Sequence, residues 1–238
     1  TRALTASGIR NYNGSTTVNN SDLTSLTNLV SGETLGLSGS GSVSSANVGS
    51  AKPVTLGSIA LVDGTGSASN YSLSSASLNV TPVQVTLTGS RNYDGTSQVQ
   101  ASDLSLGNLV GSETLNLTGT GSVSSSAVAN NYVVSQGSLV LSNGSNGGIA
   151  SNYTLSGGSK KFSISQRVLN LTGSRAYDSS VNAASSDLTL GNLVGSETLN
   201  LSGTGSVTSA QVGNGKTISL GTLSISDGTG NAGNYSLS

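Results

Sequence analysis

The strongest constraint on this chain is that one sequence unit of about eighty residues occurs three times. The segment 91–96 (Arg-Asn-Tyr-Asp-Gly-Thr) recurs with small changes at 10–15 and 175–180. The segment 108–115 (Asn-Leu-Val-Gly-Ser-Glu-Thr-Leu) is identical at 192–199, and at 28–35 two neighbouring residues are exchanged. Each unit closes with Asn-Tyr-Ser/Thr-Leu-Ser, starting at Asn70, Asn152 and Asn234.

The length of the period indicates small domains in tandem. The tyrosines of the first motif, Tyr12, Tyr93 and Tyr177, are 81 and 84 residues apart. This is too long for one coil of a β-helix or for a pair of helices, and it suits a small independent domain. We therefore define repeat 1 as 1–81, repeat 2 as 82–165 and repeat 3 as 166–238. No Pro/Gly-rich linker separates them, so neighbouring domains should abut. Repeat 3 lacks counterparts of Leu78 and Val80.

Composition excludes several classes of chemistry. The chain has no Cys, Met, Trp or His, and only 8% of its residues are charged. Without Cys it has no disulfide, thiol nucleophile or sulfur ligand for a metal, and without His it lacks the commonest general base. A net charge of −1 gives no electrostatic footprint for nucleic acid. The absence of a long apolar run argues against insertion into a membrane.

Alternating polarity predicts strands. In repeat 2, Val83, Val85, Leu87, Gly89, Arg91 and Tyr93 share one face. A second strand should run from Glu113 to Val123, with glycines on its leucine face that admit another backbone or a tyrosine ring. A third strand slips by one residue at the glycines Gly57, Gly137 and Gly221, which indicates a bulge or a corner where the strand changes partners. The closing motif predicts a fourth strand, and Asp103 after Ser102 suits one short helical turn.

Each repeat retains one Arg and one Glu at matching positions. Because alternation places both on inward faces near strand ends, we predict an ion pair in each repeat, at the rim of the core. The predicted pairs are Arg10–Glu33, Arg91–Glu113 and Arg175–Glu197.

The recurring tyrosines are expected in the cores, since the chain has few other large side chains. They are Tyr12, Tyr71, Tyr93, Tyr153, Tyr177 and Tyr235. Tyr132 occurs in repeat 2 only, which makes it a weak candidate for contacting a ligand. We expect no cofactor.

Carboxylates, calcium-like loops and lysines of this chain could carry other chemistry, but plainer structural roles are favoured. Asp103 and Glu113 could form the carboxylate pair of a glycosidase, but three identical small active sites are improbable, and we expect no enzyme. The loops after Asp63 and Asp227 resemble calcium loops, yet repeat 2 has no carboxylate there, so a tight turn is favoured. Lys52 and Lys216 align but have no Lys counterpart in repeat 2, which argues against an internal Lys–Asn cross-link.

The repeated frame resembles the YDG-type repeats of large bacterial surface adhesins, which are similar to filamentous haemagglutinin-like exoproteins exported by two-partner secretion. The motifs on which the resemblance rests are Arg-x-Tyr-Asp-Gly-Thr, Asn-Leu-Val-x-x-Glu-Thr-Leu and Asn-Tyr-Ser/Thr-Leu. The resemblance covers all three repeats. Tyr93-Asp94-Gly95 matches the Tyr-Asp-Gly motif after which these repeats are called, whereas the other two copies differ from it by one residue each.

The resemblance implies mostly-β domains that are β-grasp-like, with Ig-like sandwiches as the alternative. A single helix packed on the sheet would favour β-grasp, and its absence would favour the sandwich. It also implies a secreted or cell-surface stalk with a role in adhesion, aggregation or biofilm formation. We expect a monomeric rod with a length on the order of 100 Å. Recognition of an exopolysaccharide or a host glycan by the same protein is the alternative function.

Overall fold

The computed structural model describes residues 1–238 and contains 26 strands and six three-residue 3-10 turns. The alternation of apolar and polar residues in short segments bounded by glycines explains this content. The elements of repeat 1 are β1 Arg2–Asn11, β2 Thr17–Asn19, η1 Asn20–Asp22, β3 Ser25–Thr27, β4 Leu35–Ser38, β5 Ser40–Ser42, β6 Gly49–Val54, β7 Ala60–Asp63, η2 Ala68–Asn70 and β8 Tyr71–Thr81.

Repeats 2 and 3 follow the same order of elements. Repeat 2 contains β9 Val83–Gln84, β10 Thr86–Asn92, β11 Gln98–Gln100, η3 Ala101–Asp103, β12 Leu104–Gly107, β13 Leu115–Thr118, β14 Thr120–Ser122, β15 Ala129–Val133, β16 Val140–Asn143, η4 Ala150–Asn152, β17 Tyr153–Thr154 and β18 Lys160–Ser165. Repeat 3 contains β19 Arg167–Gly173, β20 Asn182–Ala184, η5 Ser185–Asp187, β21 Leu188–Gly191, β22 Leu199–Ser202, β23 Thr204–Val207, β24 Ile218–Ser219, β25 Ser224–Asp227, η6 Ala232–Asn234 and β26 Tyr235–Leu237.

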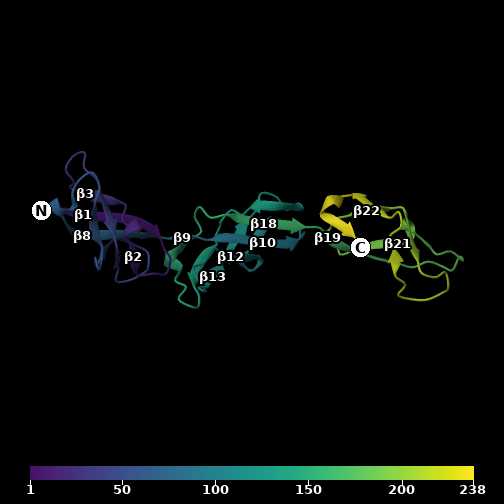
Figure 1. Ribbon diagram of the computed structural model, residues 1–238. Coiled ribbons are helices and arrows are strands. Elements are labelled where there is room, and N and C mark those ends of the chain that lie inside the picture. The colour runs from purple at the N-terminus through teal and green to yellow at the C-terminus, as the bar shows by residue number, and fades with distance from the viewer. The chain divides into compact units, whose positions relative to one another are not determined.

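The first and last strands of a repeat lie side by side. In repeat 1 the sheet order is β3-β1-β8-β6, and β1 and β8 pair in parallel over their whole length (Figure 1). The outer strands β3 and β6 are antiparallel to their neighbours. The small ladders β2–β5 and β4–β7 complete the domain, and no sheet closes into a barrel. The mostly-β expectation is therefore confirmed.

The first and last strands form a parallel pair at the centre of the sheet, and β-grasp domains have this strand order. The helix that would mark a full β-grasp is missing, because the connection between β1 and β8 runs through β-ladders and 3-10 turns instead. The predicted helical turn is η3, where the Asp103 carboxylate accepts a bond from the backbone N–H of Gln100 at 3.1 Å.

Corners at recurring glycines explain the slipped alternation. In repeat 3, β24 pairs with β23, whereas β25 pairs with β22. The chain turns between these two strands at Gly221, whose φ is +54°, and the Leu223 N–H donates to the Leu220 carbonyl. The prediction of a corner where the strand changes partners is confirmed.

The predicted second strand is two strands that meet at a positive-φ glycine. In repeat 2 the break is Gly119, between β13 and β14, and Gly39 and Gly203 stand at the equivalent breaks. A Cβ on Gly39 would lie 2.1 Å from the Ser58 carbonyl oxygen. The close neighbour is thus the backbone of the corner, so of the two alternatives the approach of another backbone is confirmed and that of a tyrosine ring is not.

Each core is filled by aliphatic side chains, with one phenylalanine in repeat 2, from the inward faces of these strands. Fully buried examples are Leu4 and Leu78 in repeat 1, Leu87, Phe162 and Ile164 in repeat 2, and Leu169 in repeat 3. Only Pro82 separates β8 from β9, and only Gln166 separates β18 from β19. One repeat therefore leads directly into the first strand of the next.

By its internal contacts the chain divides into two compact units. One comprises Thr1–Leu87, Leu106–Thr118 and Leu139–Ser159, and the other comprises Thr88–Ser105, Gly119–Ser138 and Lys160–Ser238. The division passes through repeat 2. Consequently, the residues where repeat 1 meets repeat 2 belong to the first unit, and those where repeat 2 meets repeat 3 belong to the second.

The corner geometry predicts that replacing Gly39 or Gly32 by alanine lowers the free energy of unfolding by different amounts. The two glycines have nearly equal φ, +83° at Gly39 and +85° at Gly32. A Cβ at Gly32 has no heavy atom within 4 Å, whereas at Gly39 it collides with backbone. We expect Gly32→Ala to cost about 1 kcal/mol from left-handed strain alone. Gly39→Ala should cost roughly 2–4 kcal/mol. Urea unfolding followed by circular dichroism measures both, and equal losses would contradict the corner packing.

Candidate functional site

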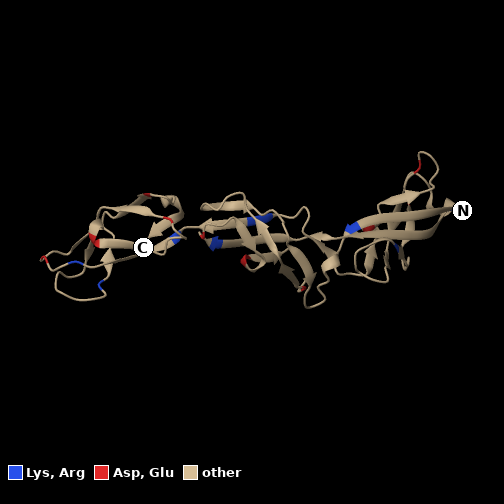
Figure 2. Cartoon of the chain, turned by 180° about the vertical axis from the view of Figure 1, so that it is seen from behind, with Lys and Arg blue, Asp and Glu red and all other residues tan.

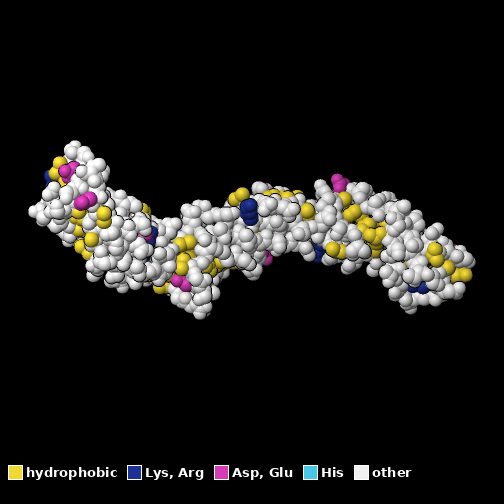
Figure 3. Space-filling view, in the orientation of Figure 1, with side chains coloured by type: hydrophobic (Ala, Val, Ile, Leu, Met, Phe, Trp, Pro, Cys, Tyr) yellow, Lys and Arg dark blue, Asp and Glu magenta, His cyan; other side chains and the backbone are white.

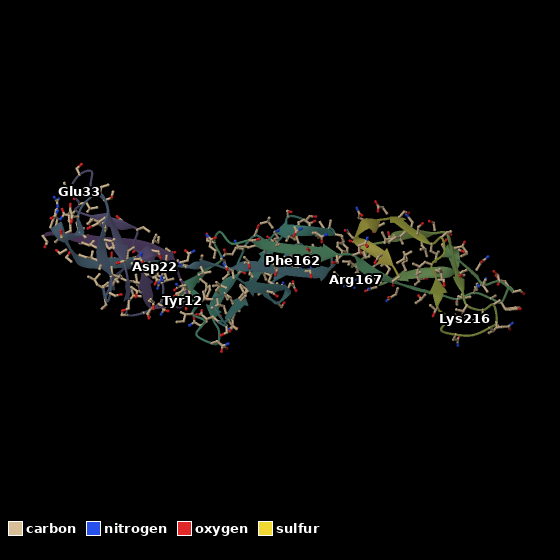
Figure 4. All side chains as sticks on the ribbon, viewed as in Figure 1. Tyr12, Asp22, Glu33, Phe162, Arg167 and Lys216 are labelled. Atoms are coloured by element: carbon tan, nitrogen blue, oxygen red, sulfur yellow. The ribbon has the colours of Figure 1, made fainter.

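The recurring glutamates bind tyrosine hydroxyls, so the predicted Arg–Glu ion pairs are wrong. None of the three predicted pairs forms, namely Arg10–Glu33, Arg91–Glu113 and Arg175–Glu197. Tyr12 and Glu33 of repeat 1 lie at opposite ends of that repeat (Figure 4). The reason for the error is that alternation identifies the face of a strand but not which end of the domain, or which repeat, the side chain meets.

At the meeting of repeats 1 and 2, one carboxylate accepts two phenols. Glu113 of repeat 2 accepts from the Tyr12 hydroxyl of repeat 1 at 2.5 Å and from the Tyr153 hydroxyl of its own repeat at 2.7 Å. The Tyr12 and Tyr153 rings pack edge to face, with centroids 5.7 Å apart. The Tyr153 oxygen also accepts from the Val110 N–H at 3.0 Å. We call this set the first junction.

The second junction repeats the same arrangement. Glu197 of repeat 3 accepts from Tyr93 of repeat 2 at 2.7 Å and from Tyr235 of repeat 3 at 2.5 Å. The two rings again pack edge to face, at 5.3 Å between centroids. The Tyr235 oxygen accepts from the Val194 N–H at 3.0 Å. Tandem repetition of the sequence therefore produces tandem repetition of one interface.

A buried asparagine adds a second connection at each junction. The Asn152 side chain has no exposed surface, and its Oδ1 accepts from the Val48 N–H of repeat 1 at 2.9 Å. The Asn152 amide also donates to Asn47 Oδ1 at 3.0 Å. In the second junction Asn234 accepts from the Val128 N–H at 2.9 Å. The Asn-Tyr pair of the closing motif thus contributes both residues to the interface.

Each residue of the Tyr-Asp/Asn-Gly tripeptide has a structural role. The tyrosine reaches the glutamate of the next repeat. The following side chain closes the turn, since Asn13 Oδ1 accepts from the Ser15 N–H at 3.0 Å. Gly14 adopts a φ of +74°, and a Cβ there would lie 3.3 Å from a methyl group of Val110 in repeat 2. A glycine fits both the backbone conformation and the close approach.

The recurring arginines hold this turn in place. Arg10 donates to the carbonyl oxygens of Ser15 and Thr17, both at 2.5 Å, and lies 3.1 Å from the Asp22 carboxylate. Its guanidinium therefore fixes the loop that presents Tyr12.

The arginines of the other repeats have the same function. Arg91 donates to the carbonyls of Thr96 and Gln98, and it lies 3.2 Å from Asp94 and 3.9 Å from Asp103. Arg175 donates to the Ser180 carbonyl and to Asp178 at 2.5 Å. The partners of the recurring arginines are therefore loop carbonyls and aspartates, in place of the predicted glutamates.

Burial and the adjacent carboxylates keep the junction tyrosines protonated. Burial, followed by the hydrogen bond to Glu113, raises the pKa of Tyr12 to about 12, and the same causes raise the pKa of Tyr153 to about 12. Burial and Glu197 raise the pKa of Tyr93 to about 12 and also raise the pKa of Tyr235. In repeat 1 the hydrogen bond to Glu33, followed by burial, raises the pKa of Tyr71.

The terminal repeats each contain half of a junction. Tyr71 donates to Glu33, but repeat 1 has no second tyrosine on that carboxylate. Tyr177 is 60% exposed, so the expectation that every recurring tyrosine lies in a core is wrong for this residue. The other recurring tyrosines are buried, as expected. Tyr177 also lacks a contact that Tyr12 makes within its own repeat, because in repeat 1 the end of the last strand pairs with Asn11 and its Thr81 carbonyl accepts from the Tyr12 N–H.

The calcium-like loops are capped turns. Asp63 accepts from the Ala68 N–H at 2.6 Å, and Asp227 accepts from the Ala232 N–H at 2.7 Å. Asn143 makes the equivalent bond to Ala150 at 2.8 Å in repeat 2. A carboxylate and an amide oxygen are interchangeable in this role, which explains why repeat 2 needs no Asp. The structure contains no cluster of three or more carboxylates that could hold a metal ion.

Lys52, Tyr132 and Lys216 occupy equivalent places. Lys52 donates to the Asn47 carbonyl at 2.5 Å, and Lys216 donates to the equivalent Gln211 carbonyl and also to the Ser209 carbonyl at 2.7 Å. The Tyr132 hydroxyl donates to the Ala127 carbonyl at 3.0 Å. Tyr132, singled out as a weak ligand candidate, thus replaces the lysine that repeat 2 lacks. All three side chains tie down the loop that carries Val48, Val128 or Val212.

The surface outside the junctions offers little specific chemistry. Lys, Arg, Asp and Glu residues are few and are scattered along the chain (Figure 2). In the space-filling view most of the visible surface is neither charged nor hydrophobic, with small separate apolar patches (Figure 3). No helix is long and apolar enough to cross a membrane.

The observed domains are a tandem series of small mostly-β modules joined by a repeated Tyr–Glu–Tyr interface. A family model described as the YDG domain matches residues 1–78, 76–161 and 160–238. Because these matches cover the whole chain, it belongs to the YDG domain family. No curated protein and no solved structure matches it.

The junction predicts a difference between two tyrosines that occupy the same motif position. Tyr12→Phe removes a hydroxyl that binds a carboxylate, so it should lower the free energy of unfolding of the first unit by about 1.5–3 kcal/mol. Tyr177→Phe should change stability by less than about 0.5 kcal/mol, because this side chain is exposed. Urea unfolding of the full chain compares them, and equal effects would contradict the cross-repeat role of Tyr12.

Alkaline pH should weaken the junctions. The pKa of Tyr12, Tyr93 and Tyr153 is about 12 in the folded chain, above the value of 10.0 for an unperturbed tyrosine. The neutral phenol therefore stabilises the fold fully below about pH 10, and this contribution is lost as the pH rises through about 12. Urea midpoints should fall over this window, in parallel with tyrosinate absorbance. A Tyr12→Phe, Tyr93→Phe double variant should show a shallower fall, and identical slopes would refute the assignment.

Proposed function

We propose that the chain is a spacer segment of a secreted bacterial surface adhesin, in which YDG domains carry other parts of the protein away from the cell. Its role would be in adhesion, aggregation or biofilm formation. The spacer role requires no catalysis. The observation that carries the proposal is the junction, which recurs with the same residues and the same geometry wherever two repeats meet.

A spacer benefits from joints that resist bending. Two phenols on one carboxylate, an edge-to-face ring pair and a buried asparagine are the contacts that would restrain bending at a junction. Hydrogen bonds to a charged group are roughly twice as strong as neutral ones. The single residue between the last strand of one repeat and the first strand of the next adds covalent restraint.

The composition is compatible with a location outside the cell. A chain without cysteine cannot form disulfides that would obstruct export in an unfolded state. The resemblance to two-partner secretion exoproteins favours the same location.

Solution scattering on the full chain tests the spacer role. We expect a maximum dimension on the order of 100 Å, as for three small domains with short connections. A Glu113→Ala, Glu197→Ala double variant should give a broader distribution of distances, because both junctions lose their shared carboxylate. Glu33→Ala is the matched control, since Glu33 binds a tyrosine of its own repeat only. A compact globule for the unmodified chain would contradict the proposal.

A second candidate function is binding of an exopolysaccharide or a cell-surface glycan. It is favoured by the exposed ring of Tyr177, because carbohydrate sites commonly present an aromatic face. A glycan array with the full chain and with Tyr177→Ala tests it. Binding that is lost in the variant would support this function, and absence of binding would leave the spacer role as the sole candidate.

A further inference from the structure

We propose that the pair formed by the first and last strands of a repeat is a mechanical clamp, which lets the repeat carry tension along the chain. In repeat 1 the clamp consists of β1 and β8. In repeat 2 it consists of β9 and β10 on one side and β17 and β18 on the other. This inference goes beyond the spacer role, which needs length and stiff connections but no resistance to pulling.

The direction of the two strands decides how a pulling force meets their hydrogen bonds. Arg2 pairs with Tyr71 at one end of the β1–β8 pair, and Asn11 pairs with Thr81 at the other end. Because the strands are parallel, the chain enters repeat 1 at the first end of the pair and leaves it at the second (Figure 1). A pull on both ends of the repeat therefore slides β1 against β8, and it stretches the backbone hydrogen bonds between them all at once.

Neighbouring strands and side chains hold this pair together along its length. β3 and β6 pair with its outer edges, and Leu4 and Leu78 on its inner face have no exposed surface. At its one irregularity the Ser74 hydroxyl donates to the Leu4 carbonyl at 2.8 Å. At its far end the Tyr12 N–H donates to the Thr81 carbonyl at 2.8 Å. Sliding would thus break these hydrogen bonds and expose the core in the same step.

Tension leaves this clamp without passing through a flexible segment. Only Pro82 separates the end of β8 from the start of β9. β9 is itself parallel to β17, with Val83 paired to Tyr153. A force on repeat 1 therefore passes from its last strand directly into the first strand of repeat 2, where the same geometry begins again.

The clamp of repeat 2 is interrupted. β17 ends at Thr154 and β18 begins at Lys160, with Gly157-Gly158 between them. The segment 152–165 is two residues longer than its counterpart 70–81 in repeat 1, where β8 runs without a break. Fewer hydrogen bonds of repeat 2 are loaded in one continuous row. Its clamp should therefore yield at a lower force than that of repeat 1.

Single-molecule stretching of the full chain in two directions tests the clamp. The chain has no Cys, so two introduced cysteines fix the points at which handles attach. Thr1→Cys with Pro82→Cys loads the β1–β8 pair along its length. Thr1→Cys with Ser69→Cys places both handles at the same end of the pair and opens it one bond at a time.

Forced unfolding depends on the barrier to unfolding along the pulling direction. We expect a several-fold higher unfolding force for the lengthwise direction at the same pulling speed. Urea midpoints equal to that of the cysteine-free chain would show that the two variants share one stability, so that only the direction differs. Equal unfolding forces in the two directions would overturn the proposal.

A second measurement leaves Pro82 in place. Thr1→Cys with Gln166→Cys loads repeats 1 and 2 together and should give two unfolding events, both above the force of the peeling direction. Deleting Gly157 and Gly158 should raise the lower of the two forces, because the last strand of repeat 2 then has the length of its counterpart. Deleting Asn146 and Gly147 is the matched control, since it removes two exposed residues outside the clamp. The same response to both deletions would contradict the assignment.

The clamp and the spacer role can fail separately. A compact globule in solution scattering would contradict the spacer role and leave the force comparison unaffected. Equal forces in the two pulling directions would contradict the clamp and leave the spacer role standing.

Discussion

A carboxylate shared between two phenols is the interaction on which the arrangement of this chain depends. Glu113 and Glu197 each accept from one tyrosine of their own repeat and one tyrosine of the preceding repeat. Removing a charge from water is costly unless hydrogen bonds replace the lost hydration, and two phenolic donors do this at each junction. The other recurring residues serve this contact. The arginine fixes the turn that presents one tyrosine, and the valine N–H positions the other.

The sequence predicts the strands well because their signal is local. Period-two alternation placed Val85, Leu87 and Tyr93 on a buried face, and the structure buries all three. The slip at Gly221 correctly indicated a change of partner. The break at Gly119 was missed, because a glycine that continues the alternation gives no sign of the carbonyl oxygen that crosses its face.

The junction was beyond sequence reasoning because its partners are far apart. Tyr12 and Glu113 are separated by 101 positions and belong to different repeats, so no periodicity links them. An inward-facing arginine and glutamate within one repeat suggested the obvious pairing by charge, whereas backbone carbonyls and aspartates satisfy the arginine. The recurrence of two tyrosines and one glutamate in every repeat was the available signal, and only the contact between repeats shows what these residues do.

The single residue between consecutive repeats sets how a chain of this kind can change in length. β8 ends at Thr81 and β9 begins at Val83, and the same spacing separates β18 from β19. Because successive side chains alternate between faces, inserting one residue there would turn the following strand inside out. Recombination that adds or deletes a complete repeat preserves the alternation of buried and exposed faces. It also preserves the tyrosine and the glutamate that meet at each junction. The protein can therefore evolve in length in whole domains, while smaller insertions are confined to loops such as Asn146–Gly148.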